Sequence, residues 1–335
     1  MIPIPWRLLP LPALAFLMAC PAKPTDTDTS EPSDADTDTD TDTDTDTDSD
    51  TDTDTGGEAF AEAVNDATFR EAIDVVATAD TLYAVGFDDE GRPVVVSVAT
   101  SGGAVTVLAS GGPLVMPSGI CLSADGSTVY VSDVASEQGS MNGGVYSLPV
   151  GGGTLTEIGT AGTIDRPGDV TLGHGGSTVY VSGFTSAGQP AVFSVDLGTG
   201  AASVAVQGAP LVDPTQLDQT EDGTKLYVLD SLAADGHRAQ VFEFTTPNFA
   251  SAVVAAGFQT NFPGGLSVAD SGATVFYTTI GDPSLMAYAT DGSGTEEIDT
   301  LGLLELPAGV CTYTDAVYVT ETSSLGGADI YSLSY

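Results

Sequence analysis

One short pattern recurs six times along most of this chain at a nearly constant spacing. Its clearest copies are PSGICLSADGSTVYVSD at Pro117–Asp133 and PGDVTLGHGGSTVYVSG at Pro167–Gly183. The six copies begin at Ala72, Pro117, Pro167, Pro214, Pro263 and Pro307, which lie 45, 50, 47, 49 and 44 residues apart. A fixed period of this size indicates a repeat architecture, in which each unit buries its apolar surface against its neighbours.

Each copy predicts strands joined by tight turns. A short apolar run is followed by a turn such as Asp125-Gly126 or Asp222-Gly223, whose residues tolerate the positive φ of tight hairpins. The next run, Thr128–Ser132 in the second copy, is rich in Val, Thr and Tyr, which favour a pleated surface. A third strand at Gly144–Leu148 and a fourth at Gly153–Ile158 complete the unit. Four antiparallel strands per unit predict one blade of a β-propeller, so we expect an all-β, six-bladed propeller.

The two ends of the repeat region predict how the ring closes. The sixth copy reaches only its third strand, Asp329–Leu333, and lacks a fourth. Phe60–Val64 precedes the first copy by the same interval at which Thr295–Asp299 precedes Pro307. We therefore predict that this N-terminal strand completes the last blade and leaves only short edges. A short amphipathic helix at Glu58–Ile73 is the alternative, because Glu and Ala are abundant there.

The motif of Pro117–Asp133 resembles the NHL, SMP-30 and YVTN-type propeller repeats. This resemblance covers about residues 58–335 and implies the six-bladed fold. Those families include binding scaffolds, lactonases and lyases, so the fold alone does not select a function. The SMP-30 lactonases hold a divalent metal with Glu, Asn and Asp. In this sequence none of the four asparagines lies at the start of an inner strand, at the position that the six copies share. The Glu-Gly-Pro sequence that is typical of the SMP-30 family is absent as well.

The first 19 residues predict a signal peptide. A positive charge precedes the apolar run Leu8–Met18, which is too short to span a bilayer. The run ends in Leu-Met-Ala-Cys, which resembles a bacterial lipobox with a diacylglyceryl group on Cys20. An ordinary secretory signal with an incidental cysteine is the alternative. Because Pro21 rather than Asp follows, we expect an anchor in the bacterial outer membrane, facing the periplasm or the cell surface.

Residues 20–57 are expected to form a disordered, acidic tether. Thr25–Thr55 alternates Thr with Asp and carries fourteen acids and no bases. Such a segment has no apolar side chains large enough to build a core, and it can bind cations only weakly and diffusely. The remaining domain, residues 58–335, keeps 33 of the 47 acids but only five of the seven Lys and Arg residues. This charge excludes nucleic acid and anionic lipid surfaces as partners, and it is compatible with cationic ones.

Chemically useful residues are expected where the inner strands meet the central channel. The positions two residues past the start of each copy are Asp74, Gly119, Asp169, Gln216, Gly265 and Gly309. Asp218 lies two residues farther along its own strand. Asp74, Asp169 and Asp218 therefore form a candidate site for Ca²⁺ or another divalent cation, with a hydrogen-bonded channel lining as the alternative. No other cofactor is expected.

The remaining candidates are interpreted as structural. Cys121 and Cys311 share one repeat position on different blades, so we expect buried free thiols rather than a disulfide. His174 and His237 lie in turns without an evident partner, and we expect both to be exposed. Three acids end second strands and are expected to make hydrogen bonds there: Asp133, Asp230 and Glu321.

The sequence thus predicts a monomeric, membrane-anchored binding module for an unknown protein, glycan or small molecule. The longest loop of the second repeat, Ala135–Gly144, is the predicted contact surface. One alternative is a metal-dependent hydrolase or lyase of lactonase type that acts in the channel. Another is a spacer of the cell envelope without a discrete ligand.

Overall fold

A computed structural model describes residues 61–66, 69–135, 142–159, 162–269, 272–298, 300, 302–322 and 328–334. These residues form strands, turns and loops. Among them no helix is long and apolar enough to cross a membrane. Cys20, the tether and most of the predicted contact loop, residues 136–141, lie outside the described residues.

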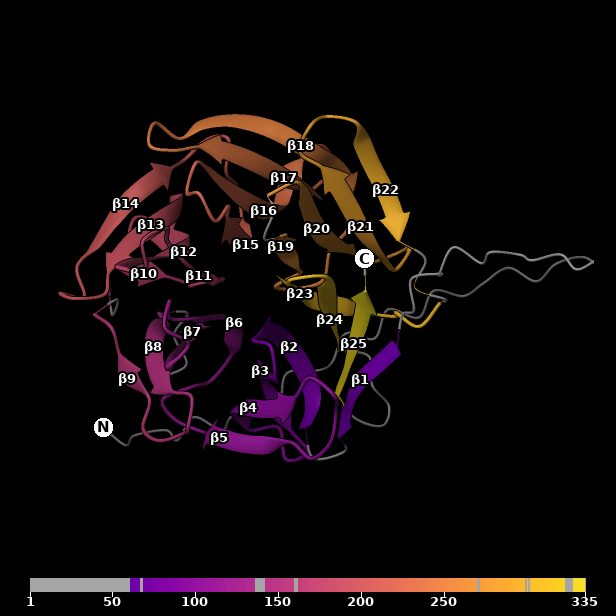
Figure 1. Cartoon of the computed structure of the whole chain (residues 1–335). Helices are drawn as coiled ribbons and strands as arrows, with labels where there is room; N and C mark the ends of the chain where they lie inside the picture. Colours follow the sequence, from indigo (N-terminus) through magenta and orange to yellow (C-terminus); the bar gives the residue numbers. More distant parts are fainter. Residues whose placement is uncertain are drawn as a thin grey trace, which may run out of the picture. The chain divides into compact units, whose positions relative to one another are not determined.

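The strands form six sheets around a central axis, which confirms the predicted propeller (Figure 1). Blade 1 contains β2 (Phe69–Ala77), β3 (Thr81–Asp88), β4 (Pro93–Ala99) and β5 (Thr106–Ser110). Blade 2 contains β6 (Pro117–Leu122), β7 (Thr128–Asp133), β8 (Gly144–Pro149) and β9 (Thr156–Glu157). Blade 3 contains β10 (Ile164–Asp165), β11 (Val170–Leu172), β12 (Thr178–Thr185), β13 (Pro190–Asp196) and β14 (Ala202–Gln207).

The second half of the ring repeats this plan. Blade 4 contains β15 (Pro214–Gln219), β16 (Lys225–Ala234), β17 (Arg238–Thr245) and β18 (Ala250–Phe258). Blade 5 contains β19 (Leu266–Val268), β20 (Thr274–Thr279), β21 (Ser284–Ala289) and β22 (Gly294–Ile298). Blade 6 contains β23 (Pro307–Tyr313), β24 (Ala316–Glu321), β25 (Ala328–Ser334) and β1 (Ala61–Asp66).

In every blade the strands pair antiparallel from an inner strand at the axis to an outer strand at the rim (Figure 1). Blade 3 differs in that its inner edge is in two pieces. Both β10 and β11 pair with β12, and Arg166 between them has a φ of 49°. A φ in this left-handed region interrupts the extended backbone, and so it accounts for the break.

The N-terminal strand closes the ring as the sequence predicted. β1 pairs antiparallel with β25, with Ala61 opposite Ser332 and Asp66 opposite Ala328. The alternative helix at Glu58–Ile73 is wrong, because its described residues lie in β1 and β2. The outer position of blade 6 offers β1 a ladder of backbone hydrogen bonds, and a helix there would leave the edge of β25 unpaired.

The described residues form six apolar core clusters, one between each pair of neighbouring blades. Strand β3 shows how alternation produces this arrangement. Leu82 and Ala84 face blade 6, whereas Tyr83 and Val85 face blade 2. Because side chains of a strand alternate between the two faces of a sheet, each blade packs against both neighbours. The outer strands are largely exposed; in β9 both residues are exposed.

Acids at the ends of three second strands hold the loop that enters each inner strand. Asp133, which is fully buried, accepts hydrogen bonds from the N–H groups of Val115, Met116 and Ala135 at 2.7–3.1 Å. Asp230 and Glu321 accept equivalent bonds in blades 4 and 6. The interpretation of these acids as structural is thereby confirmed.

Candidate functional site

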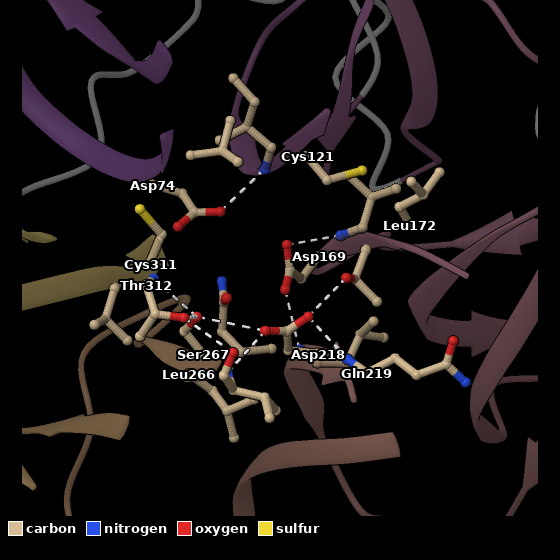
Figure 2. Close-up of a pocket in the computed structure, with 18 of the residues that line it drawn as sticks. Asp74, Cys121, Asp169, Leu172, Asp218, Gln219, Leu266, Ser267, Cys311 and Thr312 are labelled. Atoms are coloured by element: carbon tan, nitrogen blue, oxygen red, sulfur yellow. Dashed lines mark hydrogen bonds between the residues drawn. The ribbon is translucent and has the colours of Figure 1, made fainter. Parts of the chain in front are cut away.

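A pocket of about 280 Å³ lies on the propeller axis, and all six blades contribute to its wall. Most of its polar lining comes from or next to the inner strands: Asp74, Asp169, Thr171, Gln216, Asp218, Gln219, Ser267 and Thr312, with the thiols Cys121 and Cys311. Figure 2 shows the carboxyl groups of Asp74, Asp169 and Asp218 turned toward one central space. The structure thus brings the three predicted carboxyls together.

The pocket runs along the inner strands toward their C-terminal ends. Its lining includes Asp74–Ala77 in blade 1 and Glu221 in the hairpin between β15 and β16. We call the side of the disc that carries the hairpins between inner and second strands the hairpin face. Exposed acids gather in these hairpins: Asp80, Asp125, Glu221, Asp222 and Asp315. The pocket therefore reaches the hairpin face, whose acids give it a negative potential.

Each of the three carboxyls accepts a hydrogen bond from the inner strand of the next blade. Oδ2 of Asp74 accepts from the N–H of Ile120 at 3.0 Å. The corresponding bonds join Asp169 to Leu217 N at 3.0 Å and Asp218 to Val268 N at 2.8 Å. These bonds connect blades 1 to 2, 3 to 4 and 4 to 5.

Burial dominates the electrostatics of these carboxyls. It raises the pKa of Asp74 to about 8, although the N–H groups of Val75 and Ile120 act in the opposite direction. Burial, and after it the charge of Asp74, holds the pKa of Asp169 well above its usual range. Burial also raises the pKa of Asp218. Burial removes a carboxylate from bulk water, and no Lys or Arg of the described residues lines the pocket, so the neutral form is favoured.

Hydroxyl groups also connect neighbouring blades, including the pairs that the carboxyls do not join, and sequence reasoning missed them. Ser132 Oγ donates to Gly168 O at 3.3 Å, and Thr320 Oγ1 donates to Ile73 O at 3.1 Å. The same position of the second strand supplies Ser182 and Thr278, which donate to blades 4 and 6. A Ser or Thr as the fifth residue of the TVYVS-like run was the available signal. Together with the carboxyls, these hydroxyls connect every pair of neighbouring blades.

Two of the predicted channel glycines make room for carboxyls rather than line the pocket. A Cβ on Gly119 would overlap Oδ1 of Asp169, and one on Gly309 would overlap Oδ1 of Asp74. Gly265 is also close-packed, against Ala308 O of the next blade. None of these glycines is among the residues that line the pocket. Each carboxyl thus projects over a glycine of the preceding blade.

Gln216 extends across the channel at the inner end of the pocket. Its side chain is 1% exposed, and Nε2 donates to Ser118 O of blade 2 at 3.4 Å. Because a carbonyl can only accept, this contact assigns Nε2 as the donor and leaves Oε1 as an acceptor. No described residue donates a hydrogen bond to Oε1.

The predicted metal site stays a prediction. Within the described ranges, no group of three or more His, Cys, Asp or Glu side chains is arranged to hold a metal ion. Ca²⁺ prefers six to eight oxygen ligands. Here the carboxyl oxygens of Asp74, Asp169 and Asp218 already accept bonds from backbone and hydroxyl groups.

The cysteines and histidines lie as follows. Cys121 and Cys311 are buried free thiols, as predicted, and burial raises the pKa of Cys121 well above its usual value. His174 is exposed in a hairpin, with Nδ1 2.6 Å from Glu221 O. His237 is exposed in the hairpin between β16 and β17. Neither histidine lines the pocket.

Comparison with protein-family models and with curated proteins gives no match. Solved structures do resemble the fold. A gluconolactonase from Xanthomonas campestris has a TM-score of 0.61 at 15% identity, over 83% of this chain and 90% of that one. A protein of unknown function from Bacteroides thetaiotaomicron has a TM-score of 0.60 at 15% identity, over 82% and 76%. A putative TolB from Agrobacterium tumefaciens has a TM-score of 0.55 at 16% identity, over 83% and 91%. Similarity at this level of identity establishes the propeller fold and no activity.

Proposed function

We propose that this chain is a lipid-anchored, extracytoplasmic propeller that acts as a binding module. The observation that carries the proposal is the way the pocket carboxyls are held. Asp74, Asp169 and Asp218 each accept a backbone N–H of the next blade, so they join blades and shape a preformed cavity. Preformed cavities with a few oriented polar groups are typical of ligand-binding sites.

The location rests on the leader and the tether. Lipid on Cys20 would anchor the protein in the bacterial outer membrane, and the acidic segment up to residue 57 would serve as a spacer. In this arrangement the ligand is a protein, glycan or small molecule of the periplasm or the cell surface. The negative domain charge favours cationic ligands.

A metal-dependent hydrolase or lyase is the second candidate. Two observations favour it: three carboxyls share one pocket, and a gluconolactonase has a similar fold. Two observations oppose it. These carboxyls are engaged in hydrogen bonds between blades, and both histidines lie outside the pocket. A neutral histidine is the usual general base near neutral pH.

The test uses mature protein purified from membranes. We expect Cys20→Ala to move the protein to the soluble fraction and to abolish palmitate labelling, whereas Cys121→Ala keeps both. We also expect no stoichiometric divalent metal and no hydrolysis of a panel of lactones. A stoichiometric metal that is lost in Asp169→Asn, accompanied by lactone turnover, would overturn the binding module in favour of the hydrolase.

A further inference from the structure

The central pocket is unusually rich in hydrogen-bond acceptors. The hydroxyl groups of the pocket donate to other residues of its wall. Thr171 donates to Asp218 at 2.9 Å, and Thr312 donates to Val268 O at 2.9 Å. Ser267 Oγ lies 3.4 Å from Asp218 and 3.1 Å from the Thr312 hydroxyl. The pocket therefore offers an entering molecule hydroxyl lone pairs, and it offers carboxylate lone pairs wherever a cation beside the carboxyls favours their ionised form.

Gln216 supplies an acceptor that nothing in the described chain satisfies. The residue is 99% buried, its Nε2 is used by Ser118 O, and its amide borders the pocket. Oε1 is not one of the fully buried atoms without a partner among the described residues, so it is open to the pocket. A ligand that displaces water from Oε1 without donating to it would leave an unpaired acceptor, at a cost of about 1–3 kcal/mol, whereas a donor avoids this cost. This amide is independent of the carboxyls and points to the same kind of ligand, a hydrogen-bond donor.

No positive charge compensates the carboxyls. The described part of the propeller has five Lys and Arg residues, and none of them lines the pocket: Arg70, Arg92, Arg166, Lys225 and Arg238. Burial favours the neutral form of these carboxyls in the empty pocket, because an ionised carboxyl without a counter-charge is costly in a buried site. A cationic ligand would provide the missing charge, and the acids of the hairpin face would attract it.

The apolar part of the wall distinguishes an organic cation from a bare ion. Val76, Leu122, Leu172 and Val268 contribute aliphatic surface to the lining. The volume of about 280 Å³ is just below the range of pockets for drug-sized ligands, which begins at about 300 Å³. A short alkyl chain fits such walls, whereas a metal ion alone would leave them without a partner.

We propose that the central pocket binds a compact organic cation with N–H donors, a primary alkylammonium or an alkylguanidinium. Its N–H groups meet Gln216 Oε1 and the carboxyls of Asp74, Asp169 and Asp218, and its alkyl part contacts the aliphatic wall. The cation is either a free metabolite or a Lys or Arg side chain of a partner. This inference rests on the proposed binding function and specifies its ligand class.

The experiment measures binding to the mature, full-length protein by calorimetry and by thermal stabilisation. The probes are n-butylammonium, n-butylguanidinium, the donor-free tetramethylammonium, the neutral n-butanol and CaCl₂. We expect saturable binding of the first two alone. Short peptides with one internal Lys or Arg are tested as well. If the cation is a side chain of a partner protein, these peptides should bind as tightly as the free cations; if it is a free metabolite, they should not.

Variants locate the binding site. Gln216→Met removes the open acceptor, and Asp169→Asn removes a carboxyl that can ionise beside the cation. Each should weaken n-butylammonium binding by about tenfold or more. Asp80→Asn removes an exposed acid of the hairpin face that does not line the pocket, and it should change the affinity by less than about twofold. If a pocket variant fails to fold, the selectivity of the unsubstituted protein among the probes still decides.

Several outcomes would overturn the inference: no response to either donor cation, an equal response to tetramethylammonium or n-butanol, or unchanged affinity in Gln216→Met. If a neutral ligand binds instead, this inference fails while the binding module stands. If only CaCl₂ binds, and lactone turnover accompanies it, the proposed function fails as well.

Discussion

Gly119 and Gly309 determine where the buried carboxyls of the channel can lie. Each glycine faces the carboxyl of the following blade: Gly119 faces Asp169, and Gly309 faces Asp74. A methyl group at either position would displace an acid from its hydrogen bond to the next inner strand. The polar lining of the pocket thus depends on two residues that do not contact it.

We expect Gly119→Ala to lower the free energy of unfolding by about 1–3 kcal/mol, because the added Cβ overlaps Asp169 Oδ1 and lies 2.8 Å from Asp169 Cα. Gly151→Ala is the matched control, since its Cβ would have no atom within 4 Å. Urea unfolding of both variants measures the difference. Equal stability of the two variants would show that Asp169 can move without cost.

At the scale of the element, the end of each second strand holds the chain that enters the blade. Asp133 ends β7 and accepts three backbone N–H groups, two of them from residues just before β6. Burial raises the pKa of Asp133, and the same three N–H groups oppose that rise. The acid therefore stabilises a loop whose N–H groups would otherwise lack partners.

Asp133→Ala should lower the free energy of unfolding by about 2–4 kcal/mol, because three backbone N–H groups lose their acceptor. Asp315→Ala, at an exposed hairpin acid, should stay within about 0.5 kcal/mol of the unsubstituted protein. Denaturant titration followed by circular dichroism provides both values. A small effect at Asp133 would mean that water replaces the carboxylate.

At the scale of the whole molecule, one closed ring carries a large excess of acid. β1 joins β25 in blade 6, so the first and last described strands lie side by side (Figure 1). Three carboxyls with raised pKa values lie on the axis, whereas the exposed turn acids Asp125 and Asp222 have pKa values of about 2. Their hydrogen bonds to Ser and Thr groups cause this lowering. Stability should therefore fall toward both ends of the pH range.

The axis carboxyls control the alkaline side. Burial raises the pKa of Asp74 to about 8 in the folded state, against an ordinary value of 3.8 for an aspartate. Between these pH values the folded state therefore binds more protons than the unfolded state. The contribution of Asp74 to stability therefore decreases as the pH rises through this window. We expect Asp74→Asn to make the decrease shallower in thermal unfolding between these pH values, while Asp80→Asn does not. Identical pH profiles for Asp74→Asn and the unsubstituted protein would contradict the buried, neutral carboxyl.

The repeat alone was sufficient to predict the number of blades, the order of their strands and the strand that closes the ring. Turn dipeptides, β-rich runs and the alternation of apolar residues act over a few residues, so they can be read along the chain. The spacing of the six copies also placed Asp74, Asp169, Gln216 and Asp218 at the axis, where the structure has them.

Only the tertiary structure decided what these residues contact. Asp74 binds the N–H of Ile120, and Asp169 binds that of Leu217; these partners lie 46 and 48 residues away, about one repeat period. The contacts exist because neighbouring blades pack with a particular offset, which no local pattern encodes. The same packing explains three further features, since each depends on residues of other blades. These are the raised pKa values of the carboxyls, the space above Gly119 that Asp169 occupies, and the hydrogen bond from Gln216 to Ser118 O.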